Sequence, residues 1–183
     1  MPGCQQVTLC AVAHPVPLPG SARARLIDAG LAHFGDQGYE HASVTAIAAD
    51  AGVTTGSLYH HFGSKLGLYR VIREEMERRM TERMEGAIAA VGGGRESVRA
   101  ALEVAFDAAV RFGVARILAE SPPDDVADPI VELLDAHLHA TPLAGRLLVA
   151  AWRSALMAVA EGARAEVARQ GLVWVIAPPA QHV

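Results

Sequence analysis

The chain has 183 residues, a formal net charge of −4 and a hydrophobic content of 51%. This length allows one domain or two small ones with a real hydrophobic core. Aromatic residues make up only 5%, alanine is abundant, and Gly and Pro fall mostly between periodic segments. We therefore predict an all-α protein. Residues 1–90 carry 8 basic and 9 acidic side chains, and residues 91–183 carry 8 and 11. Neither half is basic enough to indicate nucleic-acid binding by charge alone.

Residues 1–20 contain four prolines, both cysteines (Cys4 and Cys10) and no Lys, Arg, Asp or Glu. Their apolar run, residues 7–13, is too short for a secretory signal or a membrane span. We expect a disordered tail, either a functional arm or a misassigned start, on a cytoplasmic protein that makes no membrane contact. Two thiols without a second pair of ligands form a poor metal site. We predict no metal and no cofactor.

The periodic part of the chain opens with a helix expected from Ser21 to about Gly35. Two short helices and a tight turn follow. Gly52 stands where the first of these should end in a left-handed conformation, and Thr54 should cap the second. Leu58 faces inward on that second helix. Its outward residues are small, polar or aromatic: Thr55, Gly56, Ser57, Tyr59 and His60. This pattern is typical of a DNA-recognition helix braced by a shorter one.

Ser64 should cap a fourth helix, which we expect to run from Lys65 to about residue 90. Its apolar residues recur every three to four positions and should be buried: Leu68, Val71, Ile72, Met76, Met80 and Met84. Its outer face carries Glu–Arg pairs four residues apart, Glu74–Arg78 and Glu75–Arg79. Three glycines in residues 91–94 mark the end of this helix.

Further helices are expected in the C-terminal half: one capped by Ser97 and reaching Val110, then residues 114–120, 128–139, 142–162 and 163–175. Asp128 before Pro129, and Thr141 before Pro142, both match a cap followed by Pro at the first helical position. The segment 142–162 is apolar almost all round and rich in alanine. A chain of this size cannot bury every side of such a helix. Together with residues 163–175 it is predicted to form half of a four-helix homodimer interface.

The segment from Leu26 to Lys65 resembles the DNA-binding domain of the tetracycline-repressor (TetR) family. The shared elements are Phe34 with Gly38-Tyr39, the core Ile47-Ala-x-x-Ala-Gly-Val53, the run Leu58-Tyr-x-His-Phe62, and Ser64-Lys65. The resemblance implies an N-terminal three-helix helix-turn-helix DNA-binding domain in residues 21–66. It also implies a C-terminal helical effector-binding and dimerisation domain in residues 67–183, with the long helix 65–90 shared. Such a protein is expected to bind double-stranded operator DNA as a homodimer, most simply as a repressor released by a small effector.

The resemblance also assigns roles to individual residues. Ser43, Tyr59, His61 and Lys65 match positions that contact phosphates in the family. Thr45, Thr55, Gly56, Ser57 and His60 match positions that approach base edges, and Thr54 caps the recognition helix between them. The chain departs from many relatives in lacking a basic arm before the first helix. Only Arg23 and Arg25 stand there.

The C-terminal half is predicted to bind a small apolar or aromatic effector. The candidate lining residues are Phe106, Val110, Ile117, Leu134, His137, Trp152 and Leu156, with Leu118 and Leu138 beside them. Candidate polar contacts are Arg116, Glu120, His137 and Arg153. The same apolar residues are equally consistent with an ordinary core. His137 and His139 are two apart on a helix and diverge, and Asp135 with His139 would supply only two ligands. We predict no metal site there.

The alternative is a helical-bundle binding protein or enzyme without a DNA role. The sequence contains no nucleophile elbow, phosphate-binding loop, dinucleotide fingerprint or zinc signature. We therefore predict no catalytic residues and a protein that is not an enzyme.

Overall fold

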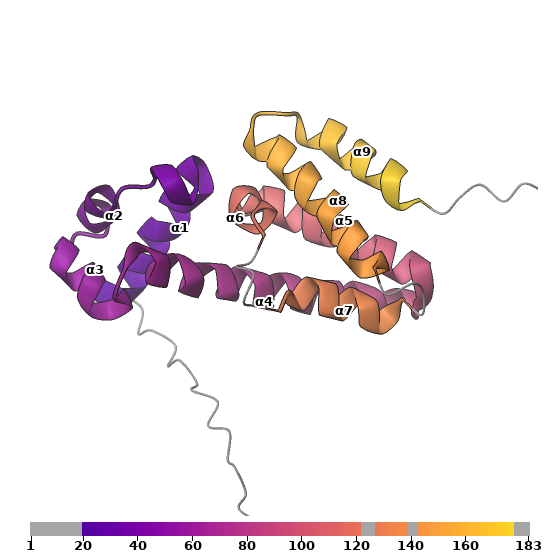
Figure 1. Cartoon of the computed structure of the whole chain (residues 1–183), viewed down its shortest axis with the longest axis horizontal. Helices are drawn as coiled ribbons and strands as arrows, with labels where there is room; N and C mark the ends of the chain where they lie inside the picture. Colours follow the sequence, from indigo (N-terminus) through magenta and orange to yellow (C-terminus); the bar gives the residue numbers. More distant parts are fainter. Residues whose placement is uncertain (1–19, 122–126, 139–142, 178–183) are drawn as a thin grey trace, which may run out of the picture.

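The computed structural model describes residues 20–121, 127–138 and 143–177. Its helices are α1 (Ala22–His41), α2 (Val44–Asp50), α3 (Thr55–Phe62), α4 (Lys65–Val91), α5 (Gly94–Arg111), α6 (Ala115–Ala119), α7 (Pro129–His137), α8 (Ala144–Ala160) and α9 (Ala165–Ile176). These ranges contain helices and no strands, which confirms the predicted all-α class. In Figure 1, α1–α3 form a head at one end of the long helix α4. α5, α6 and α7 pack against the rest of α4, α8 packs on these three helices, and α9 packs on α5 and α8.

The opening helix is longer than expected. α1 continues past Gly35 to His41, with a non-helical break only at Gly38, where φ is +79°. Gly35 allows a close approach instead of ending the helix, because a Cβ there would lie 2.7 Å from the carbonyl oxygen of Gly113. At Gly30, a Cβ would come within 2.8 Å of Ile72 Cδ1 on α4. The expected helix end at Gly35 was therefore wrong, since these glycines serve packing between helices.

The turn between α2 and α3 has the predicted local structure. Gly52 adopts a left-handed conformation with φ of +63°. The Thr54 hydroxyl accepts a hydrogen bond of 3.2 Å from the backbone N–H of Ser57. Leu58 is completely buried. The Ser64 hydroxyl likewise caps α4 by accepting from Gly67 N at 2.9 Å.

The C-terminal helices differ from prediction mainly at their starts. α5 begins at Gly94, so Ser97 is not its cap: it is buried in the first turn, where its hydroxyl donates to the Gly94 carbonyl. Asp128 does cap α7, accepting from Ile130 N at 3.1 Å. α8 begins at Ala144, and the expected Thr141–Pro142 start lies outside the described residues, as do residues 1–19 and His139.

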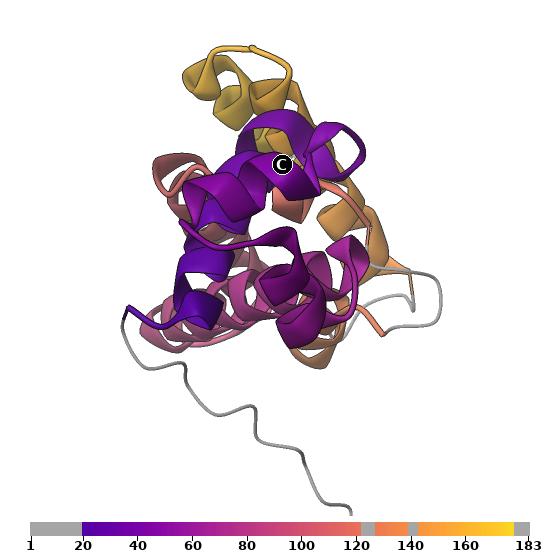
Figure 2. The same ribbon diagram turned by 90° about the vertical axis from the view of Figure 1, so that its left-hand side faces the viewer.

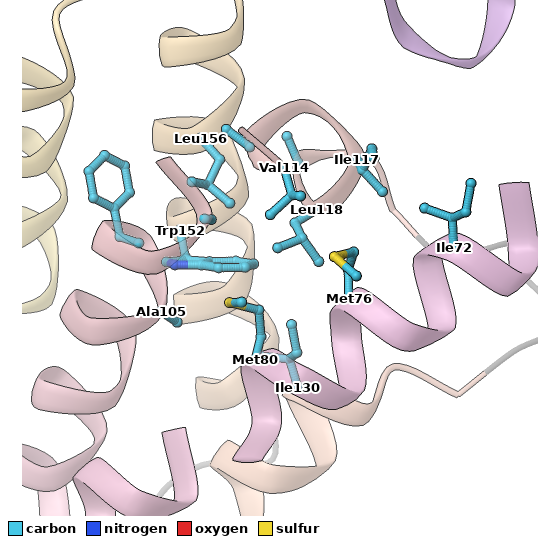
Figure 3. Packing of buried hydrophobic residues seen from close by; sticks show 14 of the residues in the cluster. Ile72, Met76, Met80, Ala105, Val114, Ile117, Leu118, Ile130, Trp152 and Leu156 are labelled. Atoms are coloured by element: carbon cyan, nitrogen blue, oxygen red, sulfur yellow. The ribbon is translucent and has the colours of Figure 1, made fainter. Parts of the chain in front are cut away.

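One hydrophobic core extends from the head into the C-terminal helices. Met76, Met80 and Met84 of α4 are buried as predicted, and Trp152 of α8 is completely buried. Figure 3 shows the Trp152 indole among side chains from α4, α6 and α8. Because the core is continuous, the head and the C-terminal helices share α4 as a common element. No helix in the described ranges combines the length and apolar character needed to cross a membrane.

Candidate nucleic-acid interface

The predicted recognition helix α3 lies on the outside of the head. Figure 1 places it at the end of the molecule opposite α7, and Figure 2 shows the head foremost. Gly56, Tyr59, His60 and His61 are exposed, Tyr59 to 52%, while Thr55 and Ser57 are half-buried. Ser43 and Thr45, at the start of α2, are also exposed. The candidate DNA-contacting residues therefore present an accessible surface made by two adjacent helices.

Gly56 has no evident role inside the fold. A Cβ built on it would meet only Thr54 Oγ1, at an ordinary 3.6 Å. A glycine in a helix costs about 0.5–1 kcal/mol relative to alanine. Close approach of another molecule to the α3 backbone is a physical reason for a glycine at this position.

Lys65 is tied to the end of α1. Its Nζ donates to the backbone carbonyl oxygen of Glu40 at 3.1 Å and lies 4.6 Å from the centre of the Tyr39 ring. The side chain is half-buried. An ammonium group has three donors, so this arrangement also leaves hydrogens that can reach a phosphate. The link between Lys65 and α1 joins residues 25 positions apart, and no sequence motif indicated it.

The two arginines at the start of α1 have different environments. Arg25 Nε donates to the carbonyl oxygen of Ala51 at 2.8 Å, which fixes α1 to the end of α2. His33 and Asp50 make a second link between the same helices, with 2.6 Å between Nε2 and Oδ2. The Arg23 guanidinium lies 5.4 Å from the Phe62 ring, beside the end of α3. Arg25 thus stabilises the head, while Arg23 stands next to the recognition helix.

The predicted effector-contacting residues come together in the C-terminal core. Phe106, Ile117, Leu134, Trp152 and Leu156 are buried; Val110 packs on the same cluster, and His137 is half-buried. Their role as the lining of a ligand pocket stays a prediction. Two of the four expected polar contacts, Arg153 and Glu120, form hydrogen bonds with other side chains of the protein: Arg153 Nη1 donates to Asp128 Oδ2 at 2.6 Å, and the Glu120 carboxylate accepts from the Tyr69 hydroxyl.

A buried ionic network joins α4 to the helices around it. Arg73 and Glu77, one turn apart on α4, are nearly inaccessible, and 2.9 Å separates Arg73 Nε from Glu77 Oε1. Burial raises the pKa of Glu77, against the lowering effect of Arg73. Burial and the hydrogen bond to Glu120 raise the pKa of Tyr69. No signal in the sequence indicated that this pair is buried, because Glu and Arg at this spacing usually lie on a solvated face.

Comparison with known proteins identifies the head. Residues 26–72 match the family of bacterial regulatory proteins described as the tetR family. The head of this chain belongs to the TetR family. The curated relative FasR of Mycolicibacterium smegmatis, an HTH-type transcriptional activator, is 35% identical over 85 residues, which are 46% of this chain and 39% of FasR. The chain thus spans well under half the length of this relative.

Solved structures of TetR-like regulators match nearly the whole fold. A TetR-like transcriptional regulator from Rhodococcus sp. RHA1 is 23% identical, with a TM-score of 0.64 over 88% of this chain and 96% of that one. LfrR from Mycobacterium smegmatis, solved in complex with proflavine, is 19% identical, with a TM-score of 0.61 over 85% of this chain and 94% of LfrR. The C-terminal helices therefore share the TetR-like arrangement as a fold.

Proposed function

We propose that this protein is a sequence-specific DNA-binding transcriptional regulator, most simply a repressor released from its operator by a small effector. The TetR-family head, with α3 exposed at the end of the molecule, carries the proposal. Its relatives are named as transcriptional regulators, which favours a regulator over an enzyme. Under this proposal Thr55, Gly56, Ser57 and His60 approach base edges, and Tyr59, His61 and Lys65 contact phosphates. Ser43 and Thr45 of the α2 start assist them.

A dimer is part of the proposal. Large exposed apolar side chains gather on α8 and α9: Leu143, Leu147, Val167, Trp174 and Val175, with Leu147 68% and Trp174 82% exposed. Burying two such surfaces against each other removes this apolar area from water. A two-fold dimer also doubles the DNA contacts, and its recognition helices would lie about 34–36 Å apart to enter successive major grooves. This doubling of contacts makes the small number of basic residues on one head tolerable.

The effector would bind in the C-terminal core, around Trp152. The apolar residues from α5, α6, α7 and α8 that meet there support this position. LfrR, which shares the fold, is described in complex with proflavine. An effector shifts DNA binding only if it binds one arrangement of the heads more tightly than the other.

The proposal is tested by incubating the purified protein with fragments of the source genome and sequencing the DNA that it retains. Recovery of a recurring two-fold symmetric site, bound with an affinity that falls steeply as salt rises, is the expected result. Retention of fragments without any shared sequence would contradict specific recognition.

A further inference from the structure

Lys65, the single lysine of the chain, begins α4 shortly after the recognition helix ends. The N-terminal end of a helix carries a positive partial charge, which disfavours an ammonium group beside it. The Lys65 side chain reaches the opposite kind of helix end, because its Nζ donates at 3.1 Å to the Glu40 carbonyl in the last turn of α1. Carbonyl groups of a last helical turn lack partners within the helix and carry negative partial charge. The end of α1 therefore attracts the ammonium group of Lys65.

Tyr39 supplies a second contact for this ammonium group. Lys65 Nζ lies 4.6 Å from the centre of the Tyr39 ring. An ammonium group within about 6 Å of the centre of an aromatic ring, over its face, is attracted by the ring electrons. Tyr39 directly follows Gly38, whose φ of +79° breaks α1. The direction in which Tyr39 meets Lys65 therefore depends on this break.

Two buried rings support Tyr39. Its ring centre is 5.0 Å from that of Tyr69 and 6.2 Å from that of Phe34. Phe34 and Tyr69 pack edge to face, with 5.2 Å between their centres. These separations lie in the range of favourable aromatic pairs. Phe34 is completely buried and Tyr69 nearly so. Tyr39, itself half-buried, thus links a rigid aromatic cluster to Lys65.

The Tyr69 hydroxyl is in turn held by α6. It donates to the carboxylate of Glu120, at the end of α6. Burial and this hydrogen bond raise the pKa of Tyr69, so the hydroxyl keeps the proton that it donates. A continuous series of contacts therefore runs from Glu120 through Tyr69 and Tyr39 to Lys65.

We propose that Tyr39 is a positioning residue for DNA binding: its ring, supported by Tyr69, holds the Lys65 ammonium group where it meets a DNA phosphate. The inference rests on the proposed function, which assigns a phosphate contact to Lys65. A long side chain that is ordered only on binding weakens the complex about 2- to 10-fold. With Tyr39 in place, this ordering has occurred on folding. If the ring instead competed with the phosphate for the ammonium group, its removal would strengthen DNA binding.

The geometry is tested first without DNA. Because Lys65 is the only lysine, 13C-labelled lysine gives the side-chain signals of this residue alone. The ring current of Tyr39 should move the Lys65 ε protons upfield of those in a free peptide. Tyr39→Phe should keep this shift, Tyr39→Leu should abolish it, and Tyr69→Phe, which loses the bond to Glu120, should reduce it. Free-peptide values in the unmodified chain would overturn the inference.

A double-mutant cycle tests the role of Tyr39 in DNA binding. The dissociation constant for a duplex carrying the selected site is measured with the unmodified chain, Tyr39→Leu, Lys65→Ala and the double variant, after circular dichroism confirms folding. We expect Tyr39→Leu to weaken binding about 2- to 10-fold when Lys65 is present and not at all in the Lys65→Ala chain. Tyr39→Phe should bind like the unmodified chain. If Tyr39→Leu does not fold, Tyr69→Phe takes its place in the cycle with the same expectation.

A merely structural role would weaken binding equally with and without Lys65. Equal losses in the two backgrounds, or stronger binding by Tyr39→Leu, would therefore overturn the inference. Sequence-specific binding by the unmodified chain is measured in the same series. Specific binding without coupling between Tyr39 and Lys65 removes only this inference, whereas an unmodified chain without specific binding removes the proposed function and this inference with it.

Discussion

The guanidinium of Arg73 on α4 donates a hydrogen bond of 2.6 Å to the backbone carbonyl oxygen of Glu120, at the end of α6. A second bond, of 2.9 Å, runs from Arg73 to the carbonyl of Ile117. α6 also lies against the head, since a Cβ built on Gly38 of α1 would be 3.2 Å from Arg116 Cδ. α6 is thus held between the shared helix α4 and the head. A displacement of α6 by an effector would reach the head through these contacts.

Truncation of Arg73 should destabilise the fold. Arg73→Ala leaves Glu77 buried without its partner and exposes two α6 carbonyls to an apolar environment, so we expect a loss of about 3–5 kcal/mol in the free energy of unfolding. Arg78→Ala on the same helix is the control. Arg78 is 55% exposed and pairs with Glu75 and Glu82, so its removal should change the free energy by less than about 1 kcal/mol. Urea unfolding followed by circular dichroism measures both, and equal effects would contradict a structural role for Arg73.

Stability should depend on pH through Glu77. Because burial raises its pKa above the ordinary value of 4.5, the folded state binds a proton more readily than the unfolded state. This contribution is therefore fully present below the unfolded-state pKa and is lost as pH rises through the folded-state pKa. Relative to Glu77→Gln, the wild type should lose stability as pH rises, with a limiting slope of about 1.4 kcal/mol per pH unit. Denaturant unfolding of both proteins, from below pH 4.5 to above the raised pKa of Glu77, measures how this difference in stability changes with pH. A difference that grows in favour of the wild type as pH rises would contradict the prediction.

Gly56→Ala should improve folding and weaken DNA binding. The added methyl group meets only Thr54 Oγ1 at 3.6 Å and removes a glycine from a helix, so stability should rise by about 0.5–1 kcal/mol. On the proposed DNA-facing surface, the same methyl group should lower the affinity for the selected site. Gly86→Ala is the matched control, because a Cβ there has no neighbour within 4 Å and the residue lies in α4, away from the head. Unchanged affinity in Gly56→Ala would argue against close approach of DNA to this turn of α3.

Local signals in the sequence were sufficient to predict much of the head. Caps such as Thr54 and Ser64 depend on residues three positions apart, so their hydrogen bonds follow from the pattern alone. Gly35 was wrongly predicted to end the helix. A glycine is required there because of its close contact with Gly113, which lies 78 positions away in the sequence.

The contacts of Arg73 with α6 could not be predicted for the same reason. They span 44 and 47 positions, and Arg73 with Glu77 has the spacing of an ordinary surface pair. The attachment of Lys65 to Glu40 is likewise a tertiary contact. The candidate DNA-facing residues were identified through family motifs, whereas the surroundings of Trp152 required the packed structure.

The proposed dimer should dissociate when charge is placed on its apolar surface. Leu147→Glu adds a carboxylate on the exposed face of α8, where it would be buried without a partner in a dimer. Phe112→Glu is the control, since Phe112 is also exposed but lies at the end of α5, outside α8 and α9. Light scattering should show monomers for the first variant and dimers for the second. A wild type that is already monomeric at micromolar concentration would contradict the dimer.

Selection of binding sites from randomised duplex DNA tests the central claim most directly. It is carried out with the wild type and with Ser57→Ala and Lys65→Ala, after circular dichroism confirms that each is folded. If α3 reads base edges through Ser57 while Lys65 contacts the backbone, the wild type should enrich a two-fold symmetric sequence. Ser57→Ala should then enrich an altered sequence, with about 1–3 kcal/mol lost on the original site. Lys65→Ala should keep the wild-type sequence at lower affinity and a smaller salt dependence. A wild type that enriches no sequence, or two variants that behave like it in both affinity and preference, would contradict recognition of DNA by this surface.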